Sequence, residues 1–307
     1  MAHLSDDCFA HHGSLMTVAE ALEQIETRLA PVVAAENMPL RAAAGRVLAQ
    51  DVVATMNLPP HANSAVDGYA LAHSDLFPDR ETLLSVRGRV AAGHLLDRPV
   101  RSGEAIRIFT GAVIPEGADT VVMQEDCLAV GGSDGQQVRI RAGARKGANC
   151  RQAGEDVRAG AVPMRAGQRL LPADLGLAAA LGCDRLSVFR PLRVGLLSTG
   201  DEVREPGRPL PRGAIYDANR IMLIALLECL GCVVNDLGIQ PDRVSLLADI
   251  FRRAAIEHDL IVASGGVSTG EEDHVRNAIE QLGSLHFWRL AIKPGKPVAL
   301  GQIGTVH

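Results

Sequence analysis

Residues 260–273 have the sequence Leu260-Ile261-Val262-Ala263-Ser264-Gly265-Gly266-Val267-Ser268-Thr269-Gly270-Glu271-Glu272-Asp273. The apolar run at the start of this segment has the length of a buried parallel strand. Glycines and hydroxyl side chains follow, so a ligand can approach the backbone closely. The three acids at the end precede a helical apolar pattern. The segment therefore predicts a strand, a glycine-rich loop and a helix.

This loop has two interpretations. In the simpler one, the acids only complement the positive end of the helix, as acids in a first turn commonly do. In the other, backbone N–H groups of the loop bind an anion and a nearby acid holds a divalent metal. A glycine-rich loop alone does not decide between them, because its spacing matches neither common nucleotide-binding motif.

Strands and helices alternate along the chain from Arg193 onward. Apolar runs at residues 194–198 and 232–234 precede helical patterns at residues 217–230 and 244–255. The helix at 217–230 is apolar on most faces, so we expect it to be enclosed. Two further strands are predicted at residues 285–290 and 298–300. This alternation is typical of a mostly parallel sheet with helices on both faces.

The first half of the chain has a different pattern. A capping box at Thr17 and Glu20 predicts a helix whose apolar face includes Val18 and Leu22, and residues 39–53 have a second helix-like stretch that ends in extended chain. Residues 57–70 are expected to form a loop. Alternating apolar runs between 83 and 141 predict β-structure, and residues 173–181 predict a helix. The fold class we expect is α/β plus β, in several domains.

Composition excludes some classes of protein. The net charge is −5 and aromatic residues make up only 3%, so we expect no nucleic-acid partner. The longest apolar run, residues 221–227, is too short to span a membrane. The polar N-terminus lacks the features of a signal peptide. We therefore expect a cytoplasmic protein without membrane contacts.

Charged side chains follow several predicted strands. Ligands bind beyond the carboxyl ends of parallel strands, which is where the acids Glu202, Asp242 and Asp273 would lie. Lys293 and Lys296 follow later, between prolines and a glycine. Each residue alone is an ordinary surface charge. Together they favour a site for an anion and Mg²⁺, which takes carboxylate and phosphate oxygens.

Two residues of the β-rich half have equally open roles. Asp67 precedes Gly68, so it either makes a turn or contacts a ligand. Thr110 is either a capping hydroxyl or a ligand contact.

Six segments, in the same order along nearly the whole chain, resemble the MoeA family of molybdopterin molybdenumtransferases, which is related to the E domain of gephyrin. The segments are residues 63–70, 110–112, 149–156, 198–202, 264–270 and 292–297. The resemblance runs from about Thr17 to about Leu300.

The resemblance implies a domain organisation and a homodimer. Residues 14–53 and 152–182 would form a discontinuous, elongated α+β domain for dimerisation, and residues 54–151 an inserted all-β domain. Residues 183–307 would form the α/β molybdopterin-binding domain. Members of the family continue into a further helix and a C-terminal β domain, so we expect this chain to be a shortened form.

The resemblance also implies the reaction. The family inserts molybdenum from molybdate into adenylylated molybdopterin and releases AMP with the help of Mg²⁺. Glu202 and Asp273 would be the metal-side carboxylates and Asp242 a further essential acid. Lys293 and Lys296 would meet molybdate or phosphate oxygens. A partner enzyme would deliver the adenylylated molybdopterin.

The remaining site residues that the resemblance implies fall into two groups. One group would bind the nucleotide end of the substrate: Ser264, Gly265, Gly266, Ser268 and Gly270. The other group would reach the cleft from the partner subunit: Asp67, Thr110, Arg151 and Asp156. Two alternatives stay open, a non-catalytic pterin- or nucleotide-binding scaffold of the same fold and a different phosphate-transfer enzyme.

Overall fold

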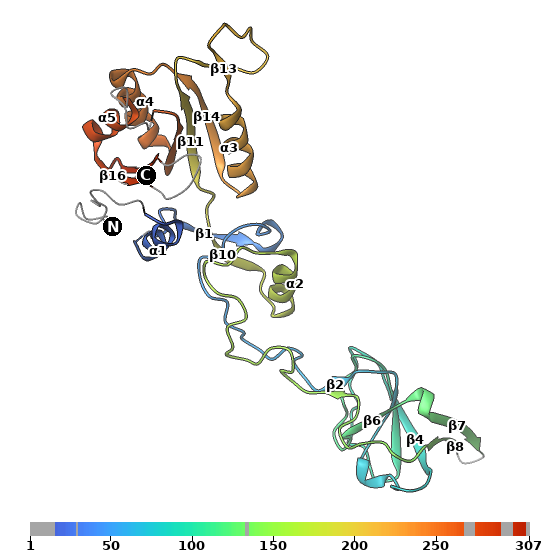
Figure 1. Ribbon diagram of the computed structural model, residues 1–307. Coiled ribbons are helices and arrows are strands. Elements are labelled where there is room, and N and C mark those ends of the chain that lie inside the picture. The colour runs from blue at the N-terminus through green and yellow to red at the C-terminus, as the bar shows by residue number, and fades with distance from the viewer. Residues whose placement is uncertain (1–15, 29, 133–134, 267–273, 290–296, 305–307) are drawn as a thin grey trace. The chain divides into compact units, whose positions relative to one another are not determined.

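The computed structural model describes residues 16–28, 30–132, 135–266, 274–289 and 297–304 (Figure 1). The chain forms two compact units. The first, here the α/β unit, contains Met1–Met38, Gly45–Ala49 and Ser187–His307. The second, here the β unit, contains Pro39–Ala44 and Gln50–Leu186.

Strand β11 (Arg193–Thr199) is the centre of the α/β unit. It pairs in parallel with β14 (Val233–Gln240) on one edge and with β15 (Leu260–Ser264) on the other. Residues 194–199 are all buried, as expected for a strand whose two faces are covered. The predicted parallel arrangement of these three strands is therefore confirmed.

Helices lie on both faces of this sheet. Helix α3 (Ala218–Cys229) lies on one side, and α4 (Val244–Glu257) and α5 (His274–Leu282) lie on the other (Figure 1). Leu197 of β11 packs with Leu247 and Phe251 of α4 and with Val275 of α5. The helical spacing predicted for α4 is confirmed by this packing.

The prediction that α3 is enclosed is wrong. Ile221, Met222 and Leu226 are between 51% and 59% exposed, whereas Arg220 is buried. The helix packs on β11 and β14 through one side. The apolar composition of a helix does not show whether a second element covers the sides that face away from the sheet.

An antiparallel pair completes this part of the α/β unit. Strand β16 (Ser284–Arg289) pairs with β17 (Pro297–Gln302). Two short strands, β12 (Val203–Arg204) and β13 (Ile215–Tyr216), form a separate pair, which is parallel. The described strands of this unit are thus parallel in part and antiparallel in part, which agrees with the α/β class.

The N-terminal helix α1 (Val18–Arg28) begins with the predicted capping box. The backbone N–H and Oγ1 of Thr17 donate to Glu20 Oε2 at 2.7 and 2.8 Å, and Glu20 N–H donates back to Thr17 Oγ1. The predicted apolar face is not buried, since Val18 and Leu22 are exposed and Ala21 is buried instead. A helical spacing cannot show which side meets a packing partner.

The predicted second helix at residues 39–53 is wrong. The chain forms strand β1 (Ala35–Pro39) and a 3-10 turn, η1 (Leu40–Ala42). Strand β1 pairs with β10 (Arg185–Phe189), and Leu48 forms a bridge with Val188. Backbone pairing with a distant segment therefore overrides the local helical pattern.

The β unit contains a six-stranded sheet in the order β6-β3-β5-β4-β8-β7. The strands are β3 (Gly68–Leu71), β4 (Thr82–Val90), β5 (Glu104–Ile108), β6 (Thr120–Met123), β7 (Cys127–Gly132) and β8 (Gly135–Ile140). Single 3-10 turns, η2 (His73–Asp75) and η3 (Gln124–Asp126), connect some of them. The predicted β region is confirmed.

Part of the predicted loop at residues 57–70 is instead strand. Asn63–Ser64 is strand β2, which pairs with β9 (Cys150–Arg151), and Gly68 begins β3. A Cβ at position 68 would overlap the carbonyl oxygen of Val122. Gly68, which suggests a turn in the sequence, therefore permits close pairing of β3 and β6.

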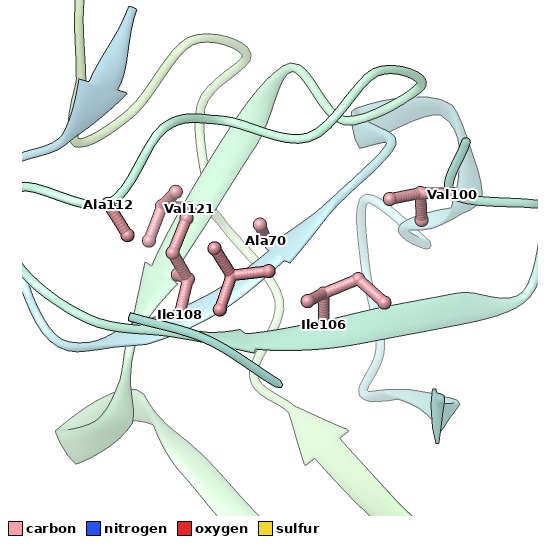
Figure 2. Close-up of a cluster of buried hydrophobic side chains, with 7 residues drawn as sticks. Ala70, Val100, Ile106, Ile108, Ala112 and Val121 are labelled. Atoms are coloured by element: carbon pink, nitrogen blue, oxygen red, sulfur yellow. The ribbon is translucent and has the colours of Figure 1, made fainter. Parts of the chain in front are cut away.

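The sheet of the β unit has apolar side chains on both faces. One cluster includes Ala70, Ile106, Ile108 and Val121 (Figure 2). The other cluster includes Leu71, Leu84, Ala105, Val138 and Ile140. Ala105 and Ile106 are neighbours on β5 and belong to different clusters, because successive side chains point to opposite faces.

Helix α2 (Pro172–Ala180) forms where the sequence predicts it. Gly182 follows with φ +82° and donates its N–H to the carbonyl of Ala179, so it ends the helix as expected. None of the helices in the described ranges has the length and apolar character that crossing a membrane requires.

Asp259 joins two arginines at the start of the parallel sheet. Its carboxylate accepts hydrogen bonds at 2.6 Å from both terminal nitrogens of Arg190. It also accepts from the Arg193 backbone N–H at 2.9 Å. Asp259 is only 8% exposed. The bonds from Arg190, followed by those from Arg193, lower the pKa of this carboxyl well below its ordinary value of 3.8, against the effect of burial.

We expect Asp259→Asn to destabilise the α/β unit by about 2 kcal/mol at neutral pH, because two guanidinium groups lose their shared carboxylate. A lowered pKa in the folded state stabilises the fold above the ordinary pKa, and this contribution is lost as the pH falls. The difference between wild type and variant should therefore begin to shrink only below about pH 4 and continue to shrink as the pH falls further. Urea unfolding, followed by fluorescence of the single tryptophan, measures it.

The matched control is Asp249→Asn on α4, which removes an exposed ion pair with Arg252. An exposed pair contributes at most about 1 kcal/mol. An equal loss of unfolding free energy in the two variants would show that the Asp259 cluster stabilises the fold no more than an exposed ion pair does.

Candidate functional site

Polar side chains gather at the carboxyl edge of the parallel sheet. Thr199 is the last residue of β11, and its Oγ1 donates to Asp242 Oδ1 at 3.3 Å. Ser264 is the last residue of β15, and its Oγ accepts from Asn219 Nδ2 at 3.3 Å. The predicted convergence of Asp242 and Ser264 on one edge is thus present, since their strands both flank β11.

Two glycines follow Ser264 in backbone conformations that other residues rarely adopt. Gly265 has φ +104° and Gly266 has φ +66°. A Cβ on Gly265 would overlap the carbonyl oxygen of Thr199, and one on Gly266 would overlap the Val275 side chain. Glycine is therefore required here for the backbone to turn tightly against β11.

Glu202 lies on residues 200–205, which follow β11 and are here called the Glu202 segment. Gly200 has φ +140°, and a Cβ there would lie 2.6 Å from Glu202 Oε2, so the exposed carboxylate folds back over this glycine. The Ile215 N–H donates to the Glu202 carbonyl oxygen at 2.9 Å. Glu202 is therefore held at its backbone, and its carboxylate is accessible.

A buried arginine fastens this segment to the sheet. The side chain of Arg220 is 3% exposed and pairs with three carboxylates from different elements. Asp217 caps α3 and accepts from Arg220 Nε at 2.9 Å, Asp236 belongs to β14, and Glu205 follows Glu202 by three residues. Burial acts to raise the pKa of Asp217, but the hydrogen bonds from Arg220 and the charge of that arginine outweigh burial, so the pKa is lowered.

A second group of predicted residues lies in the β unit. Asp67 Oδ1 accepts from Thr110 N–H at 2.8 Å and from Thr110 Oγ1 at 2.7 Å. These bonds, with the nearby charge of Arg107, lower the pKa of Asp67, so it is a carboxylate over the physiological pH range. Asp67 therefore orients Thr110 across 43 residues of sequence rather than only making a local turn.

Arg151 and Asp156 form an ion pair beside this group. Arg151 donates to Asp156 at 2.6 Å and to Glu155 at 3.2 Å. Strand β2 connects them to the loop of Thr110, because Asn63 pairs with Arg151 while the Ser64 carbonyl accepts from the Gly111 N–H at 2.8 Å. The structure thus joins the four predicted residues of the β unit in two bonded pairs, and strand β2 links the segments that carry them.

Five predicted residues lie outside the described part of the chain. They are Ser268, Gly270, Asp273, Lys293 and Lys296. Within the described ranges, no three His, Cys, Asp or Glu side chains are grouped to hold a metal ion. At the carboxyl edge, oxygen atoms that could bind a metal come from the side chains of Glu202, Asp242, Thr199 and Ser264. Oxygen is the type of metal ligand that Mg²⁺ prefers.

Comparisons with known proteins identify the family. Residues 16–182 match the family described as the MoeA N-terminal region (domain I and II), and residues 195–307 match a probable molybdopterin binding domain. The chain belongs to the MoeA family. The predicted resemblance is therefore confirmed over most of the sequence.

Relatives of the MoeA family match this chain along most of its length. A molybdopterin molybdenumtransferase of Haemophilus influenzae is 41% identical over 289 residues, which cover 94% of this chain and 70% of that protein. Molybdopterin molybdenumtransferase 2 of Mycobacterium tuberculosis is 40% identical over 275 residues, or 87% of this chain and 67% of that protein.

A solved structure shows a similar fold. The molybdopterin biosynthesis MoeA protein from Pyrococcus horikoshii superposes with a TM-score of 0.77 at 32% identity, covering 94% of this chain and 73% of that one. The α/β and β elements described above are thus those of a MoeA fold.

Sequence reasoning missed three residues of this candidate site. Thr199 and Asn219 contact Asp242 and Ser264, and Arg220 fastens the Glu202 segment. The signal was present for Arg220, because a single cation in an otherwise apolar helical stretch requires buried partners. Nothing in the sequence pairs Asn219 with Ser264, since 45 residues separate them.

We expect Glu205→Gln to loosen the Glu202 segment, because it removes the only one of the three described Arg220 carboxylates that lies on this segment. The amide proton of Ile215, which bonds to the Glu202 carbonyl, should exchange severalfold faster in a hydrogen-exchange experiment.

Asp236→Asn is the control, since Asp236 joins Arg220 to β14 and not to the Glu202 segment. Unchanged exchange at Ile215 in Glu205→Gln, or equal acceleration in both variants, would contradict the fastening role of Glu205.

Proposed function

We propose that this chain inserts molybdenum from molybdate into adenylylated molybdopterin and releases AMP. The observation that carries the proposal is the gathering of Thr199, Asp242 and Ser264 at the carboxyl edge of the sheet in a chain of the MoeA family. Parallel sheets bind ligands at this edge. The names of the relatives place them in the same transferase class.

The carboxylates provide the first part of the mechanism. We assign Glu202 and Asp273 to Mg²⁺, which when bound would neutralise charge on phosphate oxygens and on the departing AMP. Asp242 is the further acid, and its hydrogen bond with Thr199 fixes one of its oxygens at the sheet edge. Fixed groups of this kind stabilise developing charge without reorganising during the reaction.

Backbone and lysine groups provide the second part. The tight turn at Gly265 and Gly266 allows a phosphate to approach backbone N–H groups of the loop closely. We assign Ser264, Ser268 and Gly270 to the same nucleotide-binding loop. Lys293 and Lys296 bind the oxygens of molybdate or phosphate as point charges.

The residues of the β unit complete the proposal. Asp67 is ionised and holds Thr110, while Arg151 and Asp156 hold each other, so these four present fixed polar groups to a substrate. We propose that the chain acts as a homodimer, with residues 14–53 and 152–182 as its dimerisation domain, residues 54–151 as the inserted β domain and residues 183–307 as the molybdopterin-binding domain. A partner enzyme delivers the adenylylated substrate.

The deciding experiment is AMP release from adenylylated molybdopterin by the 307-residue chain with Mg²⁺, with and without molybdate. We expect release that requires both ions. Tight binding of the substrate without release would indicate a scaffold that binds pterin, and absence of binding would overturn the proposal.

Asp273→Asn should lower the rate of AMP release by about 100-fold, because an amide does not supply the negative charge that Mg²⁺ requires. Raising the Mg²⁺ concentration should restore part of the rate. A normal rate in this variant would remove Asp273 from the mechanism.

Lys293→Ala should raise the molybdate concentration needed for half-maximal release by about tenfold, because a charge-assisted hydrogen bond to an oxyanion is lost. Lys293→Arg keeps the charge and is the control. An unchanged molybdate requirement in Lys293→Ala would exclude this role.

A further inference from the structure

One face of the β unit carries a row of aromatic and cationic side chains across three adjacent strands. Tyr69 of β3 is the register partner of Arg107 of β5, and Arg107 is the register partner of Arg89 of β4. Register partners on neighbouring strands project from the same face of a sheet. Three residues that are distant in sequence therefore form a continuous surface.

A β-bulge turns Arg89 to this face. Between Val86 and Arg89, β4 has one residue more than β5, whose matching residues are Ala105 and Arg107. Val86 packs on the cluster of Ala105 and Leu84, so without the bulge position 89 would point to the other face. Bulges commonly re-aim side chains next to active sites.

Phe109 joins the row from the end of β5. Its N–H donates to the Val90 carbonyl at 3.2 Å, which continues the pairing with β4. The Arg89 guanidinium lies 4.5 Å from the centre of the Phe109 ring, and that of Arg107 lies 4.8 Å from it. Arg107 also lies 5.2 Å from the ring of Tyr69. Two cations and two rings are thus held together by cation–π contacts.

The positive charge of this row is not neutralised by hydrogen-bonded carboxylates in the described ranges. Arg107 donates to the Gly68 carbonyl at 3.0 Å and to the side-chain oxygen of Gln124, and both acceptors are neutral. Arg89 is exposed and has no ion pair with another described residue. Like charges on directly paired residues are destabilising, so an anion that binds between them would relieve this repulsion.

The row lies beside two predicted site residues. Thr110 follows Phe109 directly, and Asp67 immediately precedes β3, close enough to Arg107 for the charge of that arginine to act on its carboxylate. Asp67 and Thr110 bond to each other. The row therefore extends the group that these two residues begin.

We propose that Arg89 and Arg107, with the rings of Tyr69 and Phe109, bind a phosphate group carried on a planar ring. A guanidinium can bind phosphate oxygens through two parallel hydrogen bonds. An aromatic ring offers a stacking surface to a flat heterocycle. The inference rests on the proposed function for its ligand, since adenylylated molybdopterin carries phosphates next to pterin and adenine rings.

The experiment is calorimetric titration of the full chain with adenylylated molybdopterin, AMP and inorganic pyrophosphate. Arg89→Gln should weaken the binding of whichever phosphate ligand the wild type binds by about tenfold. Arg89→Lys should lose less binding affinity than Arg89→Gln, because lysine keeps the positive charge. Phe109→Leu should weaken the ligands with rings and leave pyrophosphate unchanged.

Arg139→Gln on β8 is the matched control, since Arg139 is an exposed arginine of the same sheet whose partner is Glu81. It should bind every ligand as the wild type does. Arg89 is exposed, so thermal unfolding should show the same midpoint in Arg89→Gln and wild type.

The outcomes separate the inference from the proposed function. If adenylylated molybdopterin is bound equally by wild type and Arg89→Gln, the inference is wrong, and the proposed function is still decided by AMP release. If AMP binds with dependence on Arg89 but adenylylated molybdopterin does not bind, the inference stands and the function falls. If pyrophosphate alone binds with dependence on Arg89, the site binds anions without a ring and the inference is overturned. If no phosphate ligand binds with dependence on Arg89, the inference is overturned.

Discussion

The α/β unit depends on the parallel pairing of β11 with β14 and β15. A strand that is paired on both edges and covered on both faces has its backbone groups satisfied and its side chains removed from water. Because the strands are parallel, their carboxyl ends lie at one edge, where Thr199, Asp242 and Ser264 are found. The position of the candidate site is thus a consequence of strand direction.

Buried charge fixes both ends of this sheet. Asp259 binds two arginines where β11 and β15 begin, and Arg220 binds three carboxylates near the opposite edge. A buried charge without partners is costly, so each cluster holds its segments in one arrangement. The Asp259 cluster stabilises the fold of the α/β unit. The Arg220 cluster fastens the segment that carries Glu202, so we expect its loss to change the position of Glu202 in the candidate site.

In the β unit, strand pairing organises the row of aromatic and cationic side chains. The register of β3, β5 and β4, together with one bulge, aligns Tyr69, Arg107 and Arg89. The same strands bury apolar side chains further along. One sheet therefore combines a core with a cationic surface, and only a shift of one residue in β4 separates this arrangement from one with Arg89 on the opposite face.

The sequence by itself determined the family, the alternation of strands and helices after Arg193, and the acids and glycines at the strand ends, because these are local patterns with fixed spacing. Tertiary structure decided the rest. Pairing with distant strands turned residues 35–39 and Gly68 into strand, and packing left α3 exposed on its apolar side. The contacts of Asn219 with Ser264, of Arg220 with Glu205 and Asp236, and of Arg89 with Phe109 join chain segments that only folding brings together, and no local pattern encodes these partners.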